Sequence, residues 1–161
     1  MRGRLFLPMR IIYRLCDDKQ HLARVQKATL TPDSSGVEPI HGIFGSPEWW
    51  KKLSSGELPV HTCRGVIAKR YMGSMNDWPE FTMRSDSGEE TSWSRYGHSG
   101  GDDRYYQVGR HIEVDYVLEQ RKANALLPAA EQRVVMEVRI DVPPESIRER
   151  IVRFRSGSHQ F

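Results

Sequence analysis

The chain has 161 residues, of which 38% are hydrophobic and 28% are charged, which suits one domain over residues 1–161 with long loops. Its 24 basic residues nearly balance 21 acidic ones, giving a formal charge of +3, so strong nonspecific binding to nucleic acid is not indicated. No apolar run approaches the ~20 residues that cross a bilayer, and residues 5–7 are too short an apolar stretch for a secretion signal, so we expect a cytoplasmic protein without a membrane partner.

The first predicted strand enters at Arg10, because residues 11, 13 and 15 are apolar and side chains alternate between the faces of a strand. Residues 21–30 admit two interpretations. Apolar residues three apart, starting at Leu22, fit one face of a helix. Residues 25–30 also fit a strand that pairs back on the first one, and we favour this hairpin.

Residues 47–55 carry the clearest helix signals. Ser46 is a good N-cap, Pro47 suits the first helical position, and Gly56 suits the left-handed residue that ends a helix. A helix of about two turns is not stable alone in water and must dock on the rest of the protein. We therefore interpret residues 31–59 as an inserted loop with one short helix.

The middle of the chain is dominated by strand-like alternation. Residues 60–71 form a long predicted strand that contains Gly65, where a bulge or bend would turn the chain. Further strands are predicted at residues 81–84, 91–95, 112–118 and 134–142. This pattern predicts a mainly-β protein, built as a small antiparallel barrel or a curved sheet. At the end of the chain, residues 146–155 fit either a helix or an edge strand, and residues 156–161 are expected to form a flexible tail.

The order of these alternating segments resembles that of small barrels of the oligonucleotide-binding or SH3-like kind. The segments that carry the resemblance are residues 66–71, 81–84, 91–95 and 108–114. The resemblance implies a small barrel and no particular activity, because such folds serve many functions.

The first functional prediction concerns the aromatic residues of the short helix. Trp49 and Leu53 are four residues apart and share a helix face, which Trp50 broadens. Large aromatic side chains anchor many protein interfaces. We therefore predict a non-catalytic binding module that uses Trp49, Trp50 and Leu53 to contact a protein partner or a second copy of itself as a homodimer. The structural alternative is that these residues close one end of the barrel.

The second prediction is single-stranded nucleic acid binding, because aromatic residues and arginines are interleaved after residue 69. Aromatic rings can stack on bases while arginines contact phosphates. The competing interpretation is that Phe81 and Trp93 face each other in the core. The predicted nucleic-acid residues are Arg70, Trp78, Arg84, Trp93, Arg95, Tyr96, Arg104 and Tyr105.

A small hydrolase or metal-dependent enzyme is the third alternative. His98, Asp102 and Asp103 lie in one glycine-rich loop and form the least implausible catalytic cluster. The sequence contains no Gly-x-Ser-x-Gly elbow and no phosphate-binding glycine-rich loop. We therefore predict no catalytic residue and no cofactor.

Two cysteines are present, and the pair His61 and Cys63 is the only local arrangement that looks like part of a metal site. A zinc site would need two more ligands, and the sequence has no Cys-x-x-Cys. Without a secretion signal, Cys16 and Cys63 are expected to be free thiols, and we predict no metal.

Overall fold

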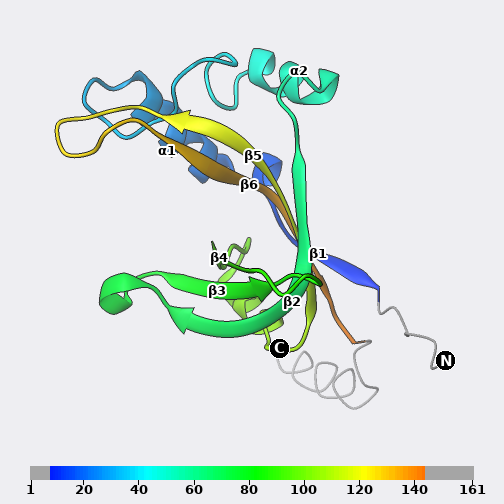
Figure 1. Cartoon of the computed structure of the whole chain (residues 1–161). Coiled ribbons are helices and arrows are strands. Elements are labelled where there is room, and N and C mark those ends of the chain that lie inside the picture. The colour runs from blue at the N-terminus through cyan, green and yellow to red at the C-terminus, as the bar shows by residue number, and fades with distance from the viewer. Residues whose placement is uncertain (1–7, 144–161) are drawn as a thin grey trace, which may run out of the picture.

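The computed structural model describes residues 8–143, and its dominant feature is one six-stranded antiparallel sheet (Figure 1). The strands follow the order β1-β6-β5-β2-β3-β4 across the sheet. Their bounds are β1 Met9–Arg14, β2 His61–Met72, β3 Pro79–Arg84, β4 Glu90–Ser94, β5 His111–Arg121 and β6 Ala130–Asp141. The predicted mainly-β curved sheet is confirmed. It is not closed into a barrel, because β1 and β4 form its two edges and do not pair with each other.

The sheet curls until side chains, rather than strand pairing, connect its two ends. Tyr13 of β1 stacks on Tyr96, which follows β4, with ring centroids 4.9 Å apart. The ring of His98 also stacks on Tyr13, with ring centroids 5.2 Å apart. The Nε2 atom of His98 accepts a hydrogen bond from the backbone N–H of Arg14 at 3.0 Å. The curl therefore depends on the aromatic residues that follow β4.

Helix α1 (Lys19–Leu30) replaces the hairpin that we favoured for residues 21–30, and that prediction is wrong. The side chain of Asp18 caps the helix by accepting a hydrogen bond from the backbone N–H of His21 at 3.0 Å. Leu22 and Thr29 are buried on the inner face. The cap and this buried face outweigh the weak alternation of residues 25–30.

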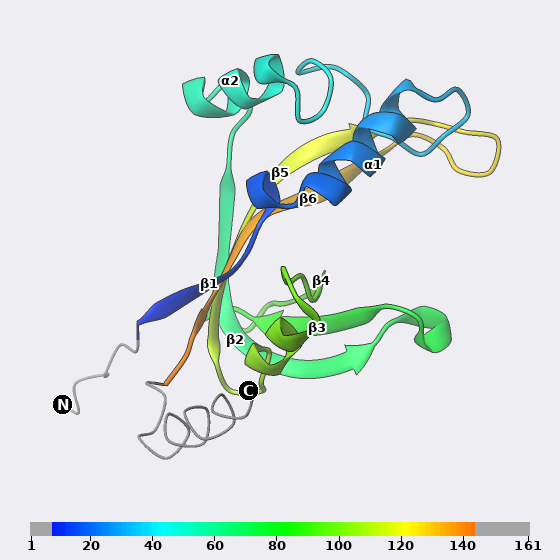
Figure 2. The ribbon, with the colours of Figure 1, turned by 180° about the vertical axis from the view of Figure 1, so that it is seen from behind.

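Helix α2 (Pro47–Ser55) has the bounds that the sequence predicts. The Ser46 hydroxyl accepts a hydrogen bond from the backbone N–H of Trp49 at 3.3 Å, and Gly56 ends the helix with a φ of 78°. Both helices cover one face of the far half of the β5–β6 hairpin (Figure 2). The C-terminal helix and tail expected over residues 146–161 lie outside the described residues.

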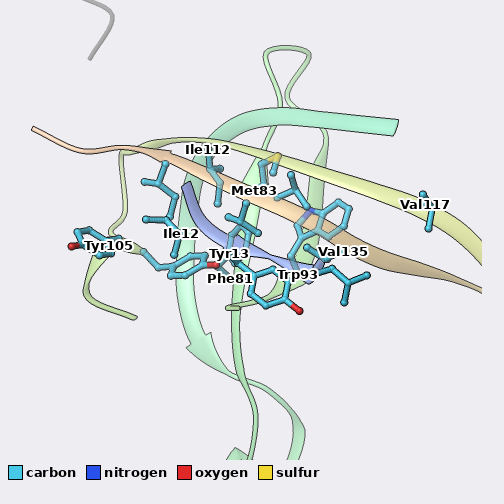
Figure 3. Close-up of a cluster of buried hydrophobic side chains, with 14 of the residues drawn as sticks. Ile12, Tyr13, Phe81, Met83, Trp93, Tyr105, Ile112, Val117 and Val135 are labelled. Carbon is cyan, nitrogen blue, oxygen red and sulfur yellow. The ribbon is translucent and has the colours of Figure 1, made fainter. Parts of the chain in front are cut away.

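Strand β5 buries opposite faces in its two halves. Ile112 and Val114 are buried in the first half, and Val117 and Glu119 are buried in the second. Successive residues of a strand point to opposite faces. The extra residue in the pairing of β5 with β6 is Met136 of β6, so the side chains of β5 alternate without interruption. The first half therefore packs against β2, β3 and β4, whereas the second half faces the helices. Figure 3 shows Val117 well along β5 from the cluster around Ile112.

Gly65 lets the backbones of β2 and β3 approach each other closely, and it does not form the bulge that the sequence suggested. The register shift between β2 and β3 lies further along, between Ile67 and Lys69. A Cβ atom at position 65 would overlap the carbonyl oxygen of Arg84. Only glycine fits this position without a shift of β3.

Candidate partner-binding surface

Two hairpins extend from the centre of the sheet in the same direction (Figures 1 and 2). One is the β2–β3 hairpin, which β4 extends, and the other is the β5–β6 hairpin. Each ends in a turn that carries exposed apolar side chains.

The end of the β2–β3 hairpin exposes Met72, Met75 and Trp78. Met75 is 93% exposed and Trp78 is 50% exposed. The backbone of Met75 is left-handed, with a φ of 63°, and the turn places its side chain in solvent. The indole of Trp78 is oriented by a hydrogen bond from its Nε1 to the Ser94 hydroxyl at 2.8 Å. The aromatic ring is therefore held in place although half of it is exposed.

The end of the β5–β6 hairpin exposes Leu126 and Leu127, which are 90% and 45% accessible. The side-chain oxygen of Asn124 accepts hydrogen bonds from the backbone N–H groups of Leu126 at 2.9 Å and Leu127 at 2.7 Å. These bonds shape the turn without help from packing of the two leucine side chains. An apolar group at a loop end that adds nothing to the core is a candidate for contact with another protein.

Between the two hairpins lie two adjoining hollows, with volumes of about 520 Å³ and 160 Å³. We call them together the inter-arm cleft. Its lining consists of Glu80, Ser92, Trp93, Ser94, Tyr96, Tyr116, Leu118, Glu131, Gln132, Arg133 and Val135. Arg133 belongs to both hollows. Its guanidinium lies 4.0 Å from the centre of the Trp93 ring and donates a hydrogen bond to the Ser92 carbonyl oxygen at 3.0 Å.

A charged cluster occupies the opposite face of the sheet, centred on Arg139. Its guanidinium donates to Glu113 at 3.0 Å, Asp115 at 2.7 Å and Glu137 at 2.6 Å. The hydrogen bond to Asp115 raises the pKa of Arg139. Burial raises the pKa of Asp115, but hydrogen bonds from Arg139 and Thr62 outweigh it and leave the pKa below its ordinary value. Arg14 also pairs with Glu137 at 2.7 Å and Arg64 with Glu113 at 3.0 Å, so three arginines balance three carboxylates and the cluster has the character of a structural network.

Three of the four arginines predicted to contact nucleic acid are paired with carboxylates. Arg70 forms an ion pair with Asp103, and Arg95 Nε lies 3.3 Å from the same carboxylate. Arg84 pairs with Glu90 at 3.1 Å. These pairs oppose phosphate binding, because a phosphate would have to displace each carboxylate.

The predicted aromatic residues are divided between core and surface. Trp93 and Tyr105 are buried, as the competing interpretation expected for Trp93. Tyr96 is half-buried. Arg104 packs over the Tyr105 ring at 4.8 Å and donates to its hydroxyl at 2.7 Å. Of this aromatic set, only Trp78 presents an exposed ring, and it lies at the hairpin end rather than on a continuous aromatic face.

The three residues predicted to bind a partner through α2 have different environments. Trp49 is completely buried, and its Nε1 donates to Glu119 Oε1 at 2.7 Å. Trp50 and Leu53 are partly buried and pack against the core. A partner could reach Trp50 and Leu53 from solvent, but Trp49 is part of the interior.

Of the loop residues proposed as a catalytic cluster, His98 and Asp103 line one hollow of about 600 Å³, whereas Asp102 does not. Asp102 accepts hydrogen bonds at 2.9 Å from the backbone N–H groups of His98 and Ser99 and so shapes the turn. Asp103 faces the arginines described above, while the His98 ring stacks on Tyr13. The three side chains therefore have separate structural contacts.

Residues 8–143 contain neither an assembled metal site nor a helix that could span a membrane. No group of three or more potential ligands is assembled in that part of the chain. His61 stacks on Tyr116, and the Cys63 sulfur contacts the Met83 sulfur at 3.4 Å. Cys16 and Cys63 are free thiols, as expected. No helix in the described region has the length and apolar character to span a bilayer.

Sequence reasoning missed the residues that define this surface. Met75, Leu126 and Leu127 lie in turns and do not stand out from core residues by their type alone. Arg133 and Glu131 precede the predicted strand at residues 134–142, and nothing local indicates that they face the inter-arm cleft. One signal could have indicated Leu126 and Leu127: they are large apolar residues in the connection between two strongly alternating strands.

Comparison with known proteins identifies the family. No curated protein matches the chain. A family model described as immunity protein RhsI2 matches residues 9–141, from the start of β1 to the end of β6. This match supports the coarse prediction of a protein-binding role and gives no support to nucleic acid binding or self-association. The chain therefore belongs to the RhsI2 family of immunity proteins.

Proposed function

We propose that this protein counteracts a toxin by binding it directly and without catalysis, using the two hairpin ends and the inter-arm cleft. Family membership supplies the class of partner, because an immunity protein acts on a toxin. The observation that carries the proposal is the exposure of Met75, Trp78 and Leu126 on hairpin ends that project in the same direction.

Binding through these ends has a physical basis. Burying apolar area contributes roughly 25 cal/mol per Å², and aromatic residues and methionine are enriched at protein interfaces. The Trp78 ring is already oriented by Ser94 and the Leu126 turn by Asn124. Less conformational entropy is therefore lost when the toxin binds than if the two ends were unstructured.

The inter-arm cleft completes the surface. It lies between the two hairpins and is lined by both apolar and charged groups, including Leu118, Trp93 and Glu131. A protruding element of the toxin can enter the cleft while the hairpin ends contact its flanks. This arrangement explains how one small sheet can present apolar, aromatic and hydrogen-bonding groups to one partner.

The test is a double variant, Trp78→Ser with Leu126→Ser, compared with the control Leu30→Ser. Leu30 is 67% exposed at the end of α1 and does not belong to the proposed surface. The readouts are growth protection when the chain is co-expressed with the toxin domain, and calorimetric affinity for the purified domain. Because a single interface hot spot is worth at least about 2 kcal/mol, we expect roughly a 30-fold or greater loss of affinity for the double variant.

The control variant should protect cells and bind the toxin as the wild type does. Both proteins should remain folded, and the double variant should show only a small decrease in melting temperature, because Trp78 is half exposed and loses one hydrogen bond to Ser94. Full protection by the double variant at normal expression level would rule out the hairpin ends as the binding surface.

A further inference from the structure

We propose that the toxin places an extended, basic segment in the inter-arm cleft and pairs it with the free edge of β4. This inference rests on the proposed function and deepens it, because it names the part of the toxin that is recognised and the manner of recognition. Adding a strand to an exposed sheet edge is an efficient way to bind a peptide segment, since backbone groups supply the affinity.

The backbone of β4 has a free side. The strand pairs with β3 only, and the backbone N–H of Arg95 donates to the Pro79 carbonyl oxygen at 2.9 Å. Because backbone groups along a strand alternate in direction, residues 91 and 93 also face β3. Ser92 and Ser94 therefore direct their N–H and C=O groups away from the sheet.

The contact with Arg133 independently supports this direction. Its guanidinium reaches the Ser92 carbonyl oxygen from the β6 side of the cleft, so that carbonyl points into the cleft. Ser92 is exposed and Ser94 is half-buried. A partner strand can reach both.

The two sheet edges differ in how they are protected. At β1, the N–H of Arg14 is already bound by His98 Nε2. Strand β4 contains neither lysine nor proline, the residues that often prevent pairing at an exposed edge. Among residues 8–143, the outward backbone of β4 has a contact with Arg133 and is otherwise open to another strand.

Charge in the cleft favours a basic occupant. The carboxylates of Glu80 and Glu131 line the two hollows, and neither has an ion-pair partner within residues 8–143. The cationic group in the same lining, Arg133, is already stacked on Trp93. Lysine or arginine side chains on the incoming strand would complement the two unpaired carboxylates.

The first experiment compares Ser92→Pro with Ser92→Ala. Proline removes the outward N–H and is tolerated at a strand edge, whereas alanine removes only the hydroxyl. With the toxin domain as the probe, we expect Ser92→Pro to lose about tenfold in affinity and Ser92→Ala to bind like the wild type. Melting temperatures of both variants show whether β4 remains folded.

The second experiment needs no variant that could unfold. Amide hydrogen exchange is followed in the wild-type protein with and without the toxin domain, and the Ser92 and Ser94 amides should become protected in the complex.

A third experiment tests the charge of the segment. The double variant Glu80→Gln with Glu131→Gln should bind the toxin domain more weakly and show a reduced dependence of affinity on salt.

The outcomes separate the two proposals. If the toxin domain binds and the hairpin-end variants weaken it, while Ser92 and Ser94 exchange at their free rates, strand pairing is overturned and the proposed function remains. If the wild-type chain neither binds nor protects against the toxin domain, both proposals fall. Unchanged affinity and salt dependence in the glutamine variant would overturn the basic character of the segment.

Discussion

Trp49 and Glu119 are joined in the protein interior by a hydrogen bond of 2.7 Å between the indole Nε1 and the carboxylate Oε1. The two residues lie 70 positions apart in the sequence. One comes from α2 and the other from the second half of β5, where the strand turns its buried face to the helices. The bond therefore fixes the inserted helix to the sheet.

Trp49→Phe tests this link. Phenylalanine keeps an aromatic ring in the core but leaves Glu119 Oε1 without its donor, while Oε2 keeps its contact with His41 Nδ1 at 3.5 Å. We therefore expect the unfolding free energy to fall by roughly 1–3 kcal/mol. Urea denaturation measures the change. The control is Trp50→Phe, which removes a donor to the partly buried Gly45 carbonyl and should cost less. Equal losses in the two variants would contradict a special role for the buried pair.

Gly65→Ala tests the close approach of β2 and β3. The added methyl group would overlap the Arg84 carbonyl oxygen, and overpacking of this kind costs about 1–3 kcal/mol. Gly100→Ala is the matched control, because a Cβ atom there meets nothing within 4 Å. Thermal unfolding should show a clear decrease for the first variant and almost none for the second. A stable Gly65→Ala protein would mean that β3 can shift without loss of packing.

His21 should make the protein sensitive to mild acid. Burial is the main cause that lowers its pKa below the ordinary value of 6.5, so the folded protein binds this proton less readily than the unfolded chain. Stability is therefore full above pH 6.5 and decreases as the pH falls from that value through the folded pKa. Between pH 7 and pH 5, a range that includes the ordinary pKa of 6.5, the melting temperature of His21→Gln should fall less than that of the wild type. The exposed His61→Gln serves as control, and identical pH profiles for all three proteins would refute the role of His21.

Arg139→Met should destabilise the charged cluster most strongly at neutral pH. In the folded protein the pKa of Asp115 lies below its ordinary value of 3.8, so its contribution is present above that pH and is lost as the pH falls through the folded value. The difference in melting temperature between wild type and variant should therefore shrink below about pH 4, where the carboxylates become protonated. Arg64→Met removes a single, more exposed contact with Glu113 and should have a smaller effect. A difference that grows in acid would contradict this account.

Much of the sheet was predictable because side-chain alternation is a local property. The strand predicted at residues 60–71 matches β2 to within one residue at each end, residues 112–118 lie in β5, and the capping signals at Ser46 and Gly56 gave the bounds of α2. Helix α1 was missed because its evidence, a cap at Asp18 and a buried face, competed with a short alternating stretch. Local pattern alone could not decide between them.

The candidate surface was much less predictable, because it depends on contacts between distant segments. The sequence indicates neither that β5 changes its buried face near Val117 nor that Trp49 reaches Glu119. Arg133 meets Trp93 across 40 positions of sequence, as a result of the curl of the sheet. The prediction that Trp50 contacts a protein partner or a second copy remains untested, and its packing against the core favours an effect on stability.

The hairpin ends owe their shape to backbone and Asn124 hydrogen bonds, and Met75 and Leu126 contribute little buried area to either layer of the core. Mutations at these positions can therefore accumulate without weakening the fold. If the hairpin ends bind the toxin as proposed, a lineage that meets an altered toxin can change its recognition there, one exposed side chain at a time, while the scaffold beneath stays the same.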